Sequence, residues 1–225
     1  MRHVFLVHGF NVKDRGAGTV GKLVPYLSQP IDDIPIHIQV HAYPWFGLFQ
    51  VMFKNRDVAE ELVKKQDLIP WNCASSYHAI GHSNGCAIIF EAAKLGAKFD
   101  SVVLINPALK MDTPIPANIK KVYVIHTAYD DATLSARVLD RLPVIRWLIP
   151  NFWGAMGTFG YKGKCDSRIA NFDMSMYLQG HSDFFTPRNL ERFAGIPLAT
   201  LLFKDSGPLW RFSTNEGACD FSTED

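Results

Sequence analysis

The 225-residue sequence lacks a long hydrophobic run, an excess of charge of either sign, and internal repeats. No apolar run approaches the roughly 18 residues that a membrane-spanning helix needs, so we expect no transmembrane segment. The N-terminal apolar run, residues 4–7, is also too short for the core of a secretion signal. Lysine and arginine total 23 against 22 acidic residues, a formal net charge of +1. This balance argues against a nucleic-acid groove or an acidic partner.

Cysteine is scarce, with four residues at positions 73, 86, 165 and 219 and no Cys-x-x-Cys pair. Disulfide frameworks are typical of much smaller secreted domains. We therefore predict reduced thiols and a cytoplasmic location.

Two partial motifs do not support a metal or a cofactor. The segment from Gly16 to Leu23 nearly matches a phosphate-binding loop, but Leu23 stands where that loop needs a hydroxyl residue. His37 and His41 have a two-ligand spacing for a helix, yet they fall in a strand pattern without a clear third ligand. We expect no metal and no cofactor.

Hydrophobic residues make up 48% of the chain, enough for one large core, and we expect a single domain over residues 1–225. Short β-branched or aromatic runs alternate with helical patterns, which predicts an α/β fold with a mainly parallel sheet of about six strands. Helices should cover both faces of this sheet. The predicted strands cover residues 4–7, 36–42, 77–80, 101–105, 121–126 and 168–176. The predicted helices cover residues 20–27, 57–65, 84–95, 134–142 and 186–203, while residues 205–225 form an irregular tail.

Gly81-His82-Ser83-Asn84-Gly85 is a Gly-x-Ser-x-Gly sequence between a predicted strand and a predicted helix. A serine on so tight a strand-to-helix turn adopts a strained backbone and projects its hydroxyl above the sheet. Glycine two positions away on either side avoids collision with the neighbouring strand and helix. Ser83 is therefore the candidate nucleophile.

The strand at 4–7 continues into His8-Gly9-Phe10. In this arrangement the loop after a neighbouring strand supplies one oxyanion donor and the residue after the serine supplies the other. We expect the backbone N–H groups of Phe10 and Asn84 to fill these roles. His8 is interpreted as a structural hydrogen-bonding residue beneath the site.

His181, in Gly180-His181-Ser182-Asp183, follows the last predicted strand and is the candidate base. The candidate acid lies in Tyr129-Asp130-Asp131, after the strand at 121–126. We favour Asp130, because Asp131 suits the first turn of a following helix. Both remain open at this stage. The end of the preceding strand is another acid position in some hydrolases, but Asn106 stands there, and an amide cannot stabilise an imidazolium as a carboxylate does.

With these residues in place, the sequence resembles the α/β-hydrolase superfamily, in particular its compact bacterial serine esterases and lipases. The resemblance covers residues 4–203 and is carried by Val-His-Gly-Phe, Gly-His-Ser-Asn-Gly, Tyr-Asp-Asp-Ala and Gly-His-Ser-Asp-Phe. It implies a three-layer α/β-hydrolase fold that lacks the first two strands of larger relatives. It also implies that Ser83 attacks a carbonyl group, His181 takes its proton and Asp130 orients His181, with a later hydrolysis of the acyl-enzyme by water.

Two aromatic stretches predict short cap or lid loops, around residues 44–56 and 143–165. If they cover the site, the substrate is a small molecule that carries an apolar acyl or alkyl group; packing against the sheet edge is the alternative. Hydrolysis of a carboxylic ester is the leading hypothesis. Thioesterase, amidase, peptidase or acyltransferase chemistry on the same residues is the alternative, followed by a non-catalytic binding protein. The oligomeric state cannot be inferred from the sequence.

Overall fold

Six parallel strands form one sheet in the order β2-β1-β3-β4-β5-β6 in the computed structural model. The structure describes residues 1–225 apart from 11, 30–31, 45–47, 71–75, 134–152 and 205–225. The strands are β1 (Arg2–Val7), β2 (Ile36–His41), β3 (Ser76–His82), β4 (Ser101–Ile105), β5 (Val122–His126) and β6 (Ile169–Asp173). Since all strands run the same way, their carboxyl ends and the loops that follow them gather at one edge of the sheet.

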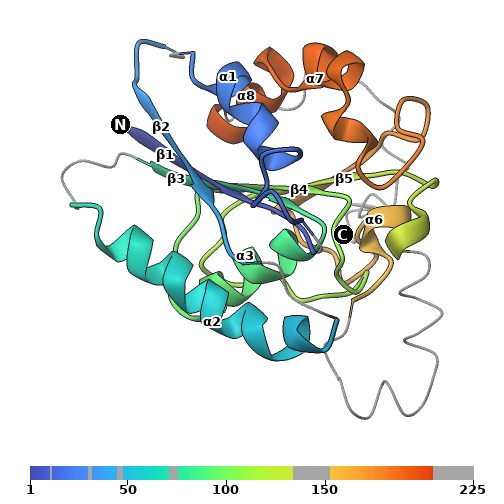
Figure 1. The fold of residues 1–225 in the computed structure, drawn as a ribbon, viewed down its shortest axis with the longest axis horizontal. Helices are drawn as coiled ribbons and strands as arrows, with labels where there is room; N and C mark the ends of the chain where they lie inside the picture. The colour runs from blue at the N-terminus through green and yellow to red at the C-terminus, as the bar shows by residue number, and fades with distance from the viewer. Residues whose placement is uncertain (11, 30–31, 45–47, 71–75, 134–152, 205–225) are drawn as a thin grey trace, which may run out of the picture.

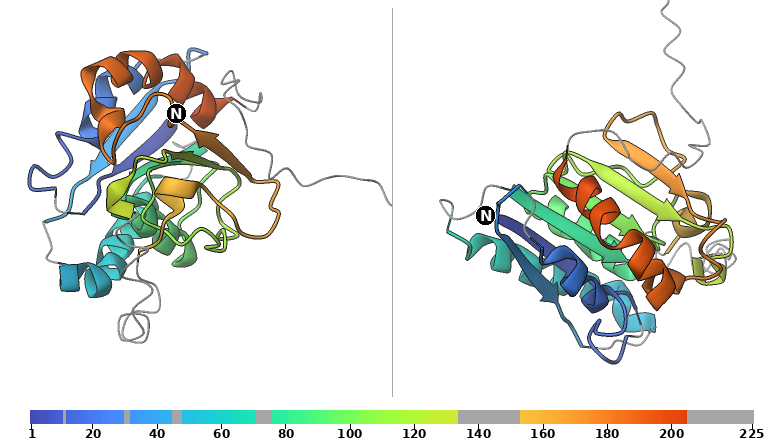
Figure 2. Two further views of the ribbon diagram at one scale, coloured as in Figure 1. Left: turned by 90° about the vertical axis from the view of Figure 1, so that its right-hand side faces the viewer. Right: turned by 90° about the horizontal axis from the view of Figure 1, so that it is seen from above.

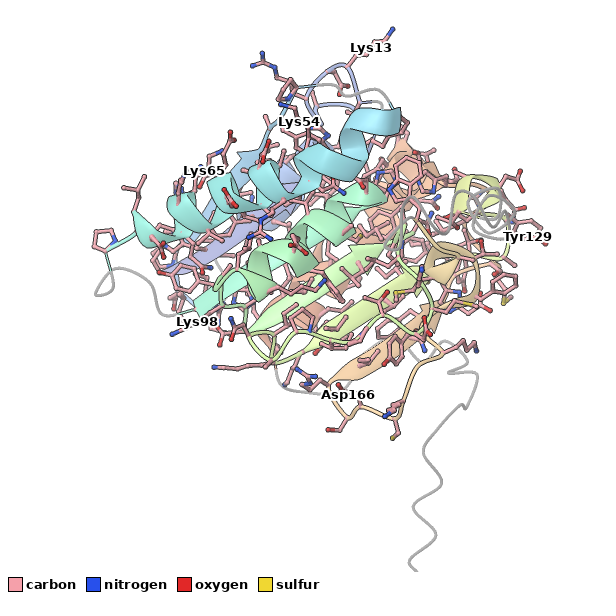
Figure 3. All side chains as sticks on the ribbon, turned by 90° about the horizontal axis from the view of Figure 1, so that it is seen from below. Lys13, Lys54, Lys65, Lys98, Tyr129 and Asp166 are labelled. Atoms are coloured by element: carbon pink, nitrogen blue, oxygen red, sulfur yellow. The ribbon has the colours of Figure 1, made fainter. Side chains whose placement is uncertain are left out.

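Helices cover both faces of the sheet and make three layers (Figure 1). One face carries a 3₁₀ turn, η1 (Val20–Leu23), with α1 (Val24–Leu27), α7 (Pro187–Phe193) and α8 (Ile196–Phe203); Figure 2 shows these helices across the sheet from above. The other face carries α2 (Leu48–Asp67) and α3 (Asn84–Lys94), which lie side by side in Figure 3. Two shorter elements, α6 (Met156–Phe159) and η2 (Asp183–Phe185), lie in the connections around β6.

The sheet separates two hydrophobic clusters. Strand β1 contributes alternate residues to each of them. Phe5 and Val7 pack with residues of α2 and α3, whereas Val4 and Leu6 pack with residues of α7 and α8. Every residue of β1 is buried. A strand covered on both faces tends to read as a continuous apolar run, which is why the apolar run at residues 4–7 marked it.

All six predicted strands are present, with ends that differ by a few residues, and the predicted three-layer fold is confirmed. The predicted helix at 57–65 is longer, because α2 begins at Leu48. Residues 48–56 were therefore wrongly predicted as part of a cap loop; no glycine or proline interrupts 48–67, so the helix extends through them. The predicted helix at 186–203 is two helices, separated at Ala194 and Gly195.

Parts of several predictions lie outside the described residues: the helix from 134, residues 143–152 of the second predicted lid segment, and the tail at 205–225. The later part of that lid segment is described, and its residues 154–158 are buried. A lid over the site therefore stays a prediction for this segment. Within the described residues, no helix combines the length and the apolar character that a membrane crossing requires.

The thiols differ from the prediction at one position. Cys165 takes part in a disulfide bond, whereas Cys86 is a buried free thiol. Cys73 and Cys219 lie outside the described residues. The prediction of reduced thiols is thus wrong at Cys165, because a disulfide depends on two backbones approaching within about 7 Å, which spacing in the sequence does not reveal. The cytoplasmic location relied partly on reduced thiols and stays a prediction without that support.

Two buried histidines are held neutral inside the sheet layers. His41, at the end of β2, bonds through Nε2 to the Val58 carbonyl (3.0 Å), and its Nδ1 lies 3.0 Å from Lys65 Nζ. Burial, with a further contribution from the Lys65 charge, lowers the pKa of His41 to about 4. His78, in β3, lies 2.6 Å from the Ser101 hydroxyl, and burial lowers its pKa to about 4 as well.

We expect the free energy of unfolding to fall as the pH is lowered from about 6.5 to about 4. In this range the unfolded chain protonates His41 and His78, whereas the folded protein takes up these protons only near pH 4. Urea titrations at several pH values measure how steeply the free energy of unfolding falls with pH. The substitution His41→Gln should make this fall shallower. The same substitution at the exposed His37 is the control. An unchanged slope in His41→Gln would contradict the assignment.

Candidate active site

Ser83 stands on the turn between β3 and α3 with φ 55° and ψ −123°. Positive φ is uncommon for a residue other than glycine and marks a strained turn. The flanking glycines make this turn possible. A Cβ atom on Gly81 would lie 2.9 Å from backbone atoms of Cys86, and one on Gly85 would collide with the carbonyls of Val7 and His8. The predicted strand–serine–helix geometry is therefore present.

Asp130 and His181, 51 positions apart, meet at the carboxyl edge of the sheet, where His181 Nδ1 lies 2.8 Å from Asp130 Oδ1. Asp130 is fully buried, while the His181 ring is partly exposed. A carboxylate can only accept, so Nδ1 carries the proton and Nε2 is left as the basic nitrogen. Asp131, the open alternative, is exposed on the surface. The structure thus brings Asp130, and not Asp131, to the imidazole.

The turn after β5 and the segment around α6 hold Asp130 in place. Its Oδ1 also accepts the Thr133 backbone N–H at 3.0 Å, and its backbone carbonyl accepts the Thr158 hydroxyl at 3.1 Å. The Thr158 and Thr133 hydroxyls lie 2.8 Å apart. Gly157 passes so close that a Cβ atom there would lie 2.5 Å from Asp130 Oδ2. Sequence reasoning missed these contacts, because it treated the segment around α6 as part of a lid.

His82 connects the segments that carry Ser83 and His181. His82, next to the serine, has its ring centroid 4.8 Å from that of His181. Among the hydrogen bonds of the described residues, none joins the Ser83 hydroxyl to His181. Such bonds often become short only when a substrate occupies the site, so this geometry does not argue against a nucleophile–base pair.

Phe10 follows Gly9, which packs against Ser83, and Asn84 directly follows Ser83 in the chain. The loop after β1 runs against the serine, since a Cβ atom on Gly9 would lie 2.8 Å from Ser83 Cβ. Asn84 is the first residue of α3, where backbone N–H groups and the positive end of the helix dipole face an anion. Within the described residues, neither the Phe10 nor the Asn84 N–H donates a backbone hydrogen bond.

Trp153 contacts both of these residues. Its indole N–H donates to Asn84 Oδ1 at 2.8 Å, and its ring centroid lies 5.0 Å from that of Phe10. Asn55, on α2, pairs its amide reciprocally with that of Asn84 at 2.8 and 2.9 Å. The sequence placed Trp153 in the second aromatic stretch, which was interpreted as a lid or as packing at the sheet edge. Its polar link to Asn84 and the role of Asn55 could not be inferred from spacing.

His8 has the structural position that was predicted for it. Its Nδ1 donates to the Gly9 carbonyl at 2.9 Å, its Nε2 accepts the Tyr43 N–H at 3.3 Å, and its ring stacks on Tyr43 at 3.9 Å. Burial lowers the pKa of His8, so the neutral ring is favoured.

In the described part of the chain, no group of three or more histidine, cysteine or acidic side chains could hold a metal ion.

Solved structures with this architecture are α/β hydrolases. The esterase Pf2001 from Pyrococcus furiosus is 10% identical, with a TM-score of 0.50, over 86% of this chain and 77% of that one. A protein described as a YdeN-like hydrolase from Pectobacterium atrosepticum is 15% identical, with a TM-score of 0.45, over 86% of this chain and 89% of that one. The phospholipase PlaB from Legionella pneumophila is 15% identical, with a TM-score of 0.43, over 59% of this chain and 40% of that chain.

No protein-family model and no curated protein matches the sequence. At such low identities, the likeness to solved structures concerns the fold alone. The chain has the α/β-hydrolase fold, as the resemblance of its motifs implied.

We expect Thr158→Val to lower the free energy of unfolding by about 1–3 kcal/mol, because it removes a buried donor to the Asp130 carbonyl. Urea denaturation measures the change. Thr200→Val is a matched control: Thr200 is equally buried, but its hydroxyl only bonds back to the Ile196 carbonyl within α8. Equal losses in the two variants would argue against a special role for the Thr158 hydroxyl.

Proposed function

We propose that the protein is a serine hydrolase that cleaves a carboxylic ester through an acyl-enzyme. One observation carries the proposal: a serine on a strained strand-to-helix turn directly follows His82, whose ring packs against the histidine of a buried Asp130–His181 pair. The chain order Ser83, Asp130, His181 is the order typical of α/β hydrolases. The fold of this chain is consistent with that chemistry, and the Asp130–His181 geometry supports the proposed catalytic residues.

The proposed reaction begins with attack of Ser83 Oγ on the ester carbonyl carbon. His181 Nε2 takes the hydroxyl proton and later gives it to the leaving alkoxide, so that an alcohol departs. Asp130 holds the imidazole in the required tautomer and stabilises the imidazolium that forms. The backbone N–H groups of Phe10 and Asn84 stabilise the oxyanion, each worth about 3–4 kcal/mol in comparable enzymes. Water, activated by His181, then hydrolyses the acyl-enzyme.

The aromatic rings of Phe10 and Trp153 lie beside the proposed oxyanion donors. Such a surface favours an apolar acyl or alkyl group, so a small hydrophobic ester is the proposed substrate. Thioesters, amides and acyl transfer to an acceptor other than water use the same intermediate and remain alternatives. No cofactor is needed for this mechanism.

Hydrolysis of p-nitrophenyl esters from acetate to palmitate tests the proposal. We expect turnover with an optimum of chain length, and Ser83→Ala should lose on the order of 10⁶ in kcat if the three residues act as a unit. Ser28→Ala, which changes an exposed hydroxyl directly after α1, is the control. Absence of Ser83-dependent turnover, together with absence of labelling by a fluorophosphonate, would refute a catalytic serine; labelling without ester turnover would favour the alternative acyl chemistries.

Asp130→Asn and Asp131→Asn form a matched pair for the acid. We expect Asp130→Asn to lower kcat by about 10⁴, because an amide favours the wrong imidazole tautomer. Asp131→Asn should leave kcat within about twofold, since its side chain is exposed. Steady-state kinetics on the best p-nitrophenyl ester gives both values. A larger loss in Asp131→Asn than in Asp130→Asn would reverse the assignment.

A further inference from the structure

The backbone carbonyl of His181 accepts two side-chain hydrogen bonds from the ends of neighbouring strands. His82, the last residue of β3, lies with Nε2 3.0 Å from the His181 oxygen. Asn106, directly after β4, donates from Nδ2 to the same oxygen at 2.7 Å and lies 3.4 Å from the Gly180 oxygen. The loop that carries the imidazole is therefore attached to the strand ends beside the serine.

His82 is suited to act as a permanent donor. Its ring is buried and packs edge-on against Phe185, with centroids 4.9 Å apart. Since a carbonyl only accepts, Nε2 carries the proton, and the buried Nδ1, which has no partner in the structure, is the unprotonated nitrogen. Burial, reinforced by the proximity of His181, lowers the pKa of His82 to about 3. The ring stays neutral near neutral pH and keeps its single N–H on the His181 oxygen.

Asn106 provides the second donor from a strained backbone. It is fully buried, has φ 44°, and its own N–H donates to the Ile125 carbonyl at 2.8 Å. Asparagine tolerates this left-handed conformation better than most residues. Its amide can donate to a carbonyl oxygen, whereas a carboxylate at the same place would oppose one acceptor with another. Asparagine at this strand end therefore fits a positioning contact rather than the role of a triad acid.

The loop around His181 is not held by packing of the residue that precedes the histidine. The preceding residue, Gly180, has no side chain to pack, and a Cβ atom built on it meets nothing within 4 Å. Asp183, two residues after His181, closes the loop, because its carboxylate accepts the N–H of Gln179 at 2.9 Å. The hydrogen bond to Asp130 orients the imidazole but does not link it to the serine. His82 provides that link, because it bonds to the His181 carbonyl and is covalently joined to Ser83.

We propose that His82 and Asn106 are positioning residues that set the separation of the Ser83 hydroxyl and His181 Nε2 by holding the His181 carbonyl. This inference rests on the proposed function of Ser83 and His181. Neither side chain is assigned a contact with substrate. In well-aligned sites, a displacement of about 1 Å can cost about 10²-fold in rate, so loss of a positioning bond should affect the chemical step rather than substrate binding.

His82→Phe and His82→Gln are the decisive pair. Phenylalanine keeps an aromatic ring in the buried site but removes the donor, whereas glutamine places an amide N–H near the position of Nε2. We expect His82→Phe to slow both kcat on a p-nitrophenyl ester and the second-order rate of fluorophosphonate labelling by about 10–100-fold, with KM changed by less than about threefold. His82→Gln should recover most of both rates.

The extent of labelling separates positioning from folding. In His82→Phe we expect slow but complete labelling of Ser83; incomplete labelling at the wild-type rate would indicate loss of folded protein and would overturn the inference. Equal slowing in His82→Gln, or a wild-type rate in His82→Phe, would overturn it as well. Asn106→Asp, which keeps the left-handed preference but replaces the donor, provides a second variant and should also slow labelling by at least about tenfold. Failure of the wild-type protein to be labelled would instead refute the proposed function itself.

Discussion

The tight turn between β3 and α3 is the constraint on which the rest of the candidate site depends. Ser83 occupies a left-handed conformation there, and α3 begins at the very next residue. The turn fits because Gly85 lets the helix approach the carbonyls of Val7 and His8 at the end of β1. The same close approach brings the loop with Phe10 against the serine. Nucleophile, neighbouring strand and candidate oxyanion donors are therefore consequences of one steric arrangement.

Burial of Asp130 imposes the second requirement. An isolated carboxylate inside a protein is costly, so it must be surrounded by donors. The Thr133 N–H and the His181 ring both donate to Oδ1, whereas the buried Oδ2 has no hydrogen-bond partner among the described residues and faces the segment around α6. Because the imidazole supplies one of the two donors to the buried carboxylate, its orientation is part of the stability of this region. The carbonyl contacts from His82 and Asn106 then add the remaining restraint on where the ring can lie.

Local rules made several elements predictable. The strands were recognised from short apolar runs, and the turn at Ser83 from two glycines at fixed spacing, because both depend on residues close together in the chain. Asp130 was preferred over Asp131 for a local reason, the first turn of a helix, and the structure places only Asp130 beside His181. Prediction was weaker for α2, whose beginning depends on an uninterrupted run of helix-forming residues rather than on a periodic pattern.

By itself, the sequence determined the class of fold, the strained turn at Ser83, and the order in which a serine, an acid and a histidine follow β3, β5 and β6. Only the tertiary structure decided which groups meet: the Asp130–His181 pair, the packing of 154–158 around Asp130, the disulfide at Cys165, and the bond from His82 to a carbonyl 99 positions away. The reason is physical. Steric limits on a turn act over a few residues, whereas hydrogen bonds that orient a buried side chain depend on how distant segments pack, and spacing along the chain carries no information about that packing.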